Sequence, residues 1–164
     1  MGFLGRLFGL RPKSEDADYE LVPSQFETGS GFVVRRLADG QRLSWRTLPH
    51  REGIEAANVV GVSHHMKALQ HSTFAPGKPL TLVPEPDNPH DPHAIGVWNA
   101  GKTKQAGYLP KSLAKEISQE LAPHGPDDEK IGCLAMWENR KNRERVGLRL
   151  LIVRSHARVR GVQF

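Results

Sequence analysis

The chain has 164 residues, the length of one ordinary domain with a short tail, and too few for a helicase motor or a two-domain enzyme. Hydrophobic residues make up 38%, which excludes a fully disordered chain, and the formal net charge is +5. Residues 131–164 carry eight basic and two acidic side chains, whereas residues 1–130 carry 15 basic and 16 acidic ones. The positive charge is therefore concentrated in the C-terminal part.

The sequence has one cysteine, Cys133, which excludes an intramolecular disulfide and a zinc cluster of thiolates, and favours a reducing, cytoplasmic setting. No apolar run approaches the roughly 18 to 20 residues that a membrane-spanning helix needs. Residues 1–30 are interpreted as a flexible tail and linker, because residues 13–30 are polar and have no sustained period. Residues 3–8 place apolar side chains at helical spacing beside arginines, so contact with a membrane surface or a partner is the alternative for this tail.

A β-hairpin is predicted within residues 31–56, because Asp39 and Gly40 form a strong turn signal between FVVRRL and RLSWRTL. Short apolar segments bounded by Pro, Gly, Asn and Asp predict further strands at residues 58–62, 80–83, 94–98, 131–137 and 146–154. One helix is predicted over residues 110–121, where apolar side chains recur every four residues and Pro110 suits the first turn. These elements predict a mostly β fold, a small β-barrel over residues 57–164 with one helix between barrel strands.

Residues 96–103, GVWNAGKT, match the G-x-x-x-x-G-K-[ST] pattern of a phosphate-binding loop. Such a loop needs a helix that begins at its Lys-Thr pair, so that backbone N–H groups point at the phosphates. Here Gly107 and Pro110 leave no room for a full helix, and residues 95–98 themselves have the character of a strand. We therefore interpret residues 99–102 as a hairpin turn and expect no nucleotide cofactor.

Eight histidines are an excess for this length, and the set His64, His65, His90, His93 and Asp91 is a candidate for a metal site. Adjacent histidines on a strand point to opposite faces, and the second pair lies in a proline-rich loop that has no helical spacing. We favour imidazoles that face solvent or make polar contacts, and we expect no metal.

Residues 59–113 contain three motifs in order: V-x-G at Val59–Gly61, E-P-x-N-P-x-D-x-x-A-I-x-V at Glu85–Val97, and G-Y-L-P at Gly107–Pro110. This part of the sequence resembles the HIRAN domain family, found in eukaryotic fork-remodelling ATPases and as a stand-alone or fused domain in bacteria. The resemblance covers residues 57–160 if the C-terminal strands are included. It implies an OB-like β-barrel that captures the 3′ end of single-stranded DNA.

The resemblance also implies site residues. Asn88 and Asp91 match the polar loop positions of the family, and Lys111 matches a basic position near the DNA backbone. Ser63 and His64 stand where the fork-remodelling member has Arg and a stacking Tyr, and His90 likewise replaces an aromatic residue. An imidazole still stacks on a base, but its smaller ring should weaken the contact. The candidate nucleic-acid-binding residues are Ser63, His64, His65, Asn88, His90, Asp91, Tyr108 and Lys111.

A basic turn follows in the C-terminal part, and it has two interpretations: a contact with the nucleic-acid backbone, or a solvated hairpin tip. Its candidate side chains are Arg140, Lys141, Arg143 and Arg145.

The sequence thus favours a non-enzymatic module that binds single-stranded DNA, chiefly at 3′ ends, in DNA repair, replication or related DNA processing. A helicase or nuclease is a candidate partner, because the chain is too short for a motor of its own. Two alternatives stay open: a metal- or nucleotide-dependent hydrolase that acts on nucleic acid or NTP, and a protein-interaction adaptor that docks through its N-terminal segment.

Overall fold

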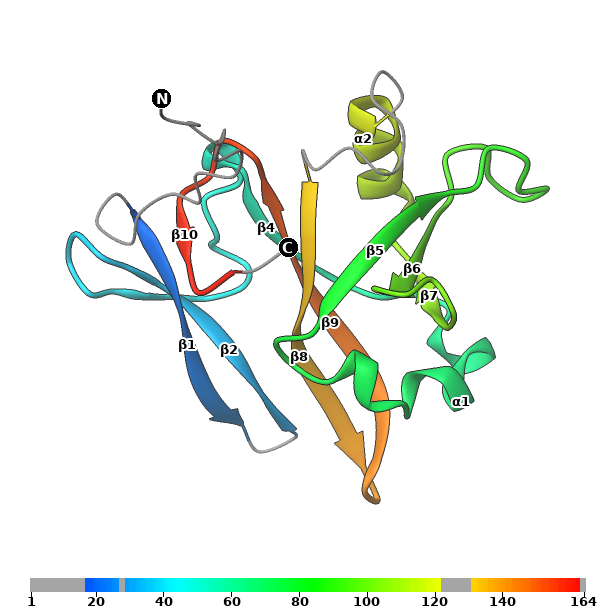
Figure 1. Ribbon diagram of the computed structural model, residues 1–164, viewed down its shortest axis with the longest axis horizontal. Helices are drawn as coiled ribbons and strands as arrows, with labels where there is room; N and C mark the ends of the chain where they lie inside the picture. Colours follow the sequence, from blue (N-terminus) through cyan, green and yellow to red (C-terminus); the bar gives the residue numbers. More distant parts are fainter. Residues whose placement is uncertain (1–16, 27–28, 122–130, 163–164) are drawn as a thin grey trace, which may run out of the picture.

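The computed structural model describes residues 17–26, 29–121 and 131–162, and it is mostly β with one main helix (Figure 1). The predicted fold class is confirmed. In chain order the elements are β1 (Tyr19–Phe26), β2 (Gly29–Arg36), β3 (Arg42–Leu43), η2 (His50–Glu52), β4 (Ile54–Asn58), η3 (Val62–His64), α1 (Met66–Leu69), η4 (Ser72–Phe74), β5 (Pro79–Pro84), β6 (Ile95–Asn99), β7 (Gln105–Tyr108), α2 (Lys111–Leu121), β8 (Ile131–Lys141), β9 (Glu144–Arg154) and β10 (Val159–Arg160).

Strand β8 lies at the centre of the sheet and pairs with β2, β5 and β9. One arm continues from β5 through β6 to β7, and the other runs from β9 to β4. Among the described residues, the two arms do not close through a ladder of paired strands. They meet at one isolated bridge, where the backbone N–H groups of Val60 and Tyr108 each donate to the other residue's carbonyl at 2.9 Å.

A glycine allows this close approach. Gly107 has φ +148°, and a Cβ atom there would lie 2.3 Å from the carbonyl oxygen of Val60. Real side chains do not tolerate such a contact, so only glycine permits the bridge next to Tyr108. The fold therefore requires the glycine at the first position of the G-Y-L-P motif.

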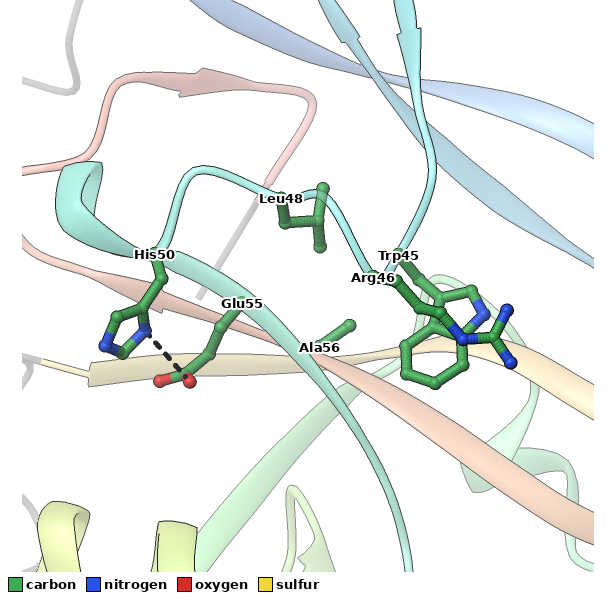
Figure 2. A pocket seen from close by; sticks show the side chains of 6 residues that line it. All are labelled: Trp45, Arg46, Leu48, His50, Glu55 and Ala56. Atoms are coloured by element: carbon green, nitrogen blue, oxygen red, sulfur yellow. Dashed lines mark ion pairs between the residues drawn. The ribbon is translucent and has the colours of Figure 1, made fainter.

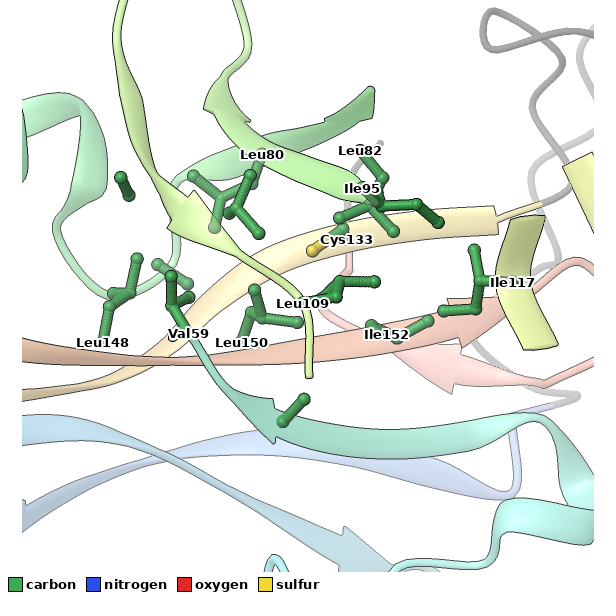
Figure 3. Packing of buried hydrophobic residues seen from close by; sticks show 14 of the residues in the cluster. Val59, Leu80, Leu82, Ile95, Leu109, Ile117, Cys133, Leu148, Leu150 and Ile152 are labelled. Carbon is green, nitrogen blue, oxygen red and sulfur yellow. The ribbon is translucent and has the colours of Figure 1, made fainter. Parts of the chain in front are cut away.

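Two hydrophobic clusters occupy opposite faces of β8 and β9, because successive side chains of a strand alternate between faces. The larger cluster lies between the two arms and packs against α2, and it includes Leu82, Ile95, Ile117, Cys133 and Ile152 (Figure 3). The smaller cluster lies under the β1–β2 hairpin. Its buried members are Tyr19, Val34, Leu43, Ile54, Leu134, Met136, Leu151 and Val153.

Most sequence-predicted elements are present. The helix at residues 110–121 is confirmed as α2, and Asp39–Gly40 is a turn between β2 and β3, with Gly40 at φ +70°. The strand expected at residues 58–62 is displaced, since β4 ends at Asn58 and a 3-10 turn follows. Among the described residues, no helix is long and apolar enough to cross a membrane.

The linker interpretation of residues 13–30 is wrong for β1. Its eight residues pair with β2 in an antiparallel ladder, and the Tyr19 side chain is buried in the smaller cluster. The sequence pattern missed this strand because Pro23 and several polar residues interrupt its alternation. The membrane or partner contact expected from residues 3–8 lies outside the described residues.

Candidate nucleic-acid interface

The loop between β5 and β6, residues 85–94, is fixed by its own polar groups. The Asn88 side-chain oxygen accepts from the backbone N–H of His90 at 3.0 Å, and the Asp91 carboxylate accepts from the backbone N–H of His93 at 2.9 Å. The Glu85 N–H closes the loop by donating to the carbonyl of Ala94 at 2.8 Å. Two such side-chain turns in succession hold the backbone rigid, as the Asn-Pro and Asp-Pro pairs predict.

Glu85 joins this loop to β7. Its Oε2 atom accepts from the Tyr108 hydroxyl at 3.2 Å and from the Asn88 side-chain amide at 3.0 Å. The other side of Tyr108 meets the ring of His65 edge-on, with centroids 6.0 Å apart and planes at 67°. The contacts therefore bring together three segments that are far apart in the sequence: the turn after β4, the β5–β6 loop and β7.

Glu85 was not among the predicted site residues, although it opens the E-P-x-N-P motif. A carboxylate placed between a tyrosine hydroxyl and an amide donor orients both groups. The sequence signal that marks it is its position before the paired turns, but that position alone does not reveal which donors it meets.

His65 is held in the neutral form at neutral pH. Its half-buried position lowers the pKa of the imidazole, and the neighbouring His64 lowers it further. A neutral imidazole beside Tyr108 extends the aromatic surface without adding a fixed charge. The negative charge of Glu85 opposes this shift by raising the pKa of His65.

The remaining predicted residues lie next to these contacts in the chain. Ser63 and His64 are exposed on the 3-10 turn, and His90 is exposed on the β5–β6 loop. Lys111 is exposed at the first position of α2. The loop also reaches α2 directly, because His93 Nδ1 and Ser118 Oγ lie 3.2 Å apart.

The basic turn divides into two kinds of residue. Lys141 and Arg143 are exposed at the β8–β9 turn, and Arg140 is paired with the carboxylate of Glu138 at 2.7 Å. Arg145 is only 2% exposed, so the prediction that it contacts a nucleic-acid backbone is corrected. In Figure 1 this turn and the β5–β6 loop lie at opposite ends of the molecule.

Arg145 points inward because the β8–β9 ladder shifts register between Asn139 and Arg140, so that Arg145 and Arg149 do not share a face. Its guanidinium donates to Glu138 Oε2 at 2.5 Å, to the carbonyl of His71 at 2.8 Å and to the carbonyl of Leu69. These partners satisfy a buried cation and fix the segment after α1 against β9.

The phosphate-loop pattern at residues 96–103 forms a turn between β6 and β7. The buried Asn99 side chain accepts from the backbone N–H groups of Thr103 at 2.8 Å and Lys104 at 3.0 Å. No helix begins at Lys102 and Thr103, since the next element is β7. The amide of Asn99 uses the backbone donors that a phosphate would need.

One group of described side chains has the spacing of metal ligands, and it is not the set that the sequence suggested. Ligand atoms of His50, Glu55 and Glu116 lie within 4.8 Å of one another (Figure 2 shows His50 and Glu55). Arg154 already binds both carboxylates, at 2.5 Å and 3.0 Å, and also binds Glu120 at 2.9 Å. Because a guanidinium occupies these oxygens, we assign the group to a charge network.

The sequence model of the HIRAN domain matches residues 56–153. The chain belongs to the HIRAN domain family. HIRAN domains are nucleic-acid-binding modules, and the matched residues include all eight positions of the candidate site. A comparison with curated proteins finds no match.

Two solved structures are similar to this HIRAN protein. The HIRAN domain of human HLTF is 21% identical, over 65% of this chain and 81% of that one, with a TM-score of 0.44. A protein from Lactobacillus plantarum is 18% identical, over 62% of this chain and 99% of that one, with a TM-score of 0.47.

Proposed function

We propose that this HIRAN domain captures single-stranded DNA at its 3′ end, through the surface between the β5–β6 loop, β7 and the turn after β4. The observation that supports the proposal best is the contact chain from Asn88 through Glu85 and Tyr108 to His65. The exposed His64, His90 and Lys111 lie beside members of this chain of contacts in the sequence, and the half-buried Asp91 belongs to the same loop as Asn88. Rigid aromatic platforms with nearby cations suit single strands, whose bases are free to stack.

Each group has a distinct role in the proposal. His64 and His90 are exposed and offer rings on which bases stack, while Lys111 meets a phosphate. The half-buried Asp91 accepts a hydrogen bond from the terminal 3′ hydroxyl through the oxygen that does not bind His93. A 3′ phosphate in that place would bring a negative charge against the carboxylate, so the site should discriminate between the two ends.

Asp91→Asn tests this role, because an asparagine side chain keeps the acceptor for the His93 N–H but removes the charge. We expect this variant to lose discrimination between a 3′ hydroxyl and a 3′ phosphate while keeping its fold. Lys111→Ala should weaken the binding of both strands equally, since a contact with a phosphate does not depend on the group at the 3′ terminus. Equal effects of the two substitutions on both strands, measured by fluorescence anisotropy, would contradict this division of roles.

The domain would then act as a binding module that delivers a strand end to other components of DNA repair, replication or related DNA processing, a helicase or nuclease among them. Turnover that depends on added metal or nucleotide would favour the hydrolase alternative instead. Partner recovery that is lost on deleting residues 1–16, with DNA affinity unchanged, would favour the adaptor.

A further inference from the structure

Two tryptophans and two arginines form a stack on the face of β8 and β9 that carries the smaller cluster. The Arg149 guanidinium carbon lies 3.8 Å from the Trp45 ring centroid and 4.8 Å from that of Trp137. The Arg46 guanidinium carbon lies 4.4 Å from the same Trp45 ring. We name these four side chains the tryptophan–arginine surface.

One side of this surface packs on the protein, and the other side is exposed to solvent. Trp45 packs against the smaller cluster, and Arg149 donates from Nε to the Asn58 side-chain oxygen at 2.9 Å. Arg46 is exposed. A pocket of about 450 Å³ adjoins the stack, and Trp45 and Arg46 form part of its wall (Figure 2).

The charge of this surface is not compensated. Within residues 17–26, 29–121 and 131–162, no carboxylate pairs with Arg46 or Arg149, whereas Arg145 and Arg154 are each held by acidic side chains. Burial lowers the pKa of Arg149, and the positive charge of Arg46 lowers it further. Two cations that lie close together without an anion are stabilised when an anion binds to both.

The backbone that anchors this surface leads directly into the turn that carries part of the proposed 3′-end site. Asn58, which binds Arg149, precedes Ser63 of that site by five residues. Five extended residues span at most about 17 Å. That distance equals about five nucleotides at the 3.4 Å rise per nucleotide of one duplex strand, and fewer when the strand is stretched.

We propose that the tryptophan–arginine surface is a second contact for the same single strand, several nucleotides before the 3′ end. The inference rests on the proposed function and extends it. A base stacks on the Trp45 ring in place of Arg46, and the two guanidinium groups meet the neighbouring phosphates. Indole stacking and guanidinium–phosphate contacts accept any base, so this contact adds affinity and length dependence but no sequence preference.

Trp45 and Arg46 lie before residue 56, where the match to the HIRAN domain begins, whereas Trp137 and Arg149 lie inside it. The residues outside the matched region thus complete the surface by adding one ring and one cation.

The test uses the full chain and labelled DNA strands of about 5 and about 15 nucleotides, a range that matches the site sizes of single-strand-binding barrels. Arg46→Ala and Trp45→Leu should each weaken binding of the long strand by about fivefold or more, with little effect on the short strand. Arg51→Ala is the matched control, since Arg51 is exposed in the same segment and its loss changes the net charge equally. A long strand should also quench tryptophan fluorescence in the wild type, and Trp45→Leu should reduce that quenching.

The outcomes separate this inference from the proposed function. Suppose that the wild type binds both strands, and that Arg46→Ala binds the long strand as tightly as the wild type or the Arg51→Ala control does. The proposal of a second contact is then wrong, while the proposal of a 3′-end site still stands. If the wild type binds neither strand at low salt, the proposed function fails, and this inference fails with it.

Discussion

Arg145 offers a sharp test of the structure, because the sequence groups it with the exposed basic turn while the fold buries it. Arg145→Met keeps most of the side-chain volume but removes the guanidinium from Glu138 and from the carbonyls of Leu69 and His71. Glu138, only 4% exposed, is then left with Arg140 as its remaining ion-pair partner. Breaking one side of a buried ion pair typically costs about 3–5 kcal/mol, and each unsatisfied buried carbonyl adds to that cost.

We therefore expect Arg145→Met to lower the free energy of unfolding by about 3–5 kcal/mol, a large share of the 5–15 kcal/mol of a typical domain. Urea denaturation followed by tryptophan fluorescence measures this change. Arg143→Met is the matched control, because Arg143 is exposed at the turn, and its effect should stay within about 0.5 kcal/mol. A loss below about 1 kcal/mol for Arg145→Met would refute the buried position of this side chain.

Three further predictions follow from the described contacts. Asn99→Ala should destabilise the fold by about 2 kcal/mol in urea denaturation, because it leaves two turn N–H groups without their acceptor, and the variant should leave DNA affinity unchanged. Because the fold lowers the pKa of His65, this imidazole binds a proton at higher pH in the unfolded chain than in the folded one. The free energy of unfolding should therefore decrease as the pH falls below about 6.5. His65→Phe should reduce that decrease, and an unchanged pH profile would contradict the assignment. Burial raises the pKa of the Cys133 thiol, so a thiol reagent should label the native protein only as fast as unfolding exposes this side chain. Fast labelling would contradict the buried position.

The sequence predicted much of the fold because its signals were local. The repeat of apolar residues in 110–121 and the Asp39–Gly40 turn are set by neighbouring residues, and both are present. Strand β1 was missed because its order comes from pairing with β2 and from the burial of Tyr19, and these are not local properties. Propensity alone does not reveal a strand that its partner stabilises.

The candidate site was predictable to a similar degree. The turn chemistry of Asn88 and Asp91 follows from their types and spacing, and the structure shows both turns. The junction at Glu85 was missed because it depends on Tyr108, 23 residues away, reaching the same carboxylate. The burial of Arg145 was missed for a related reason: a charge run gives no indication of which member meets a buried partner.

The central claim is that this HIRAN domain binds the 3′ end of single-stranded DNA, and one anisotropy experiment tests it most directly. A short labelled strand that ends in a 3′ hydroxyl is compared with the same strand ending in a 3′ phosphate, at two salt concentrations. The claim predicts tighter binding of the 3′ hydroxyl strand, with log K falling against log salt at a slope of about −2 to −3.5 if three to five phosphates are neutralised. Equal binding of the two strands, or affinity that does not respond to salt, would contradict it.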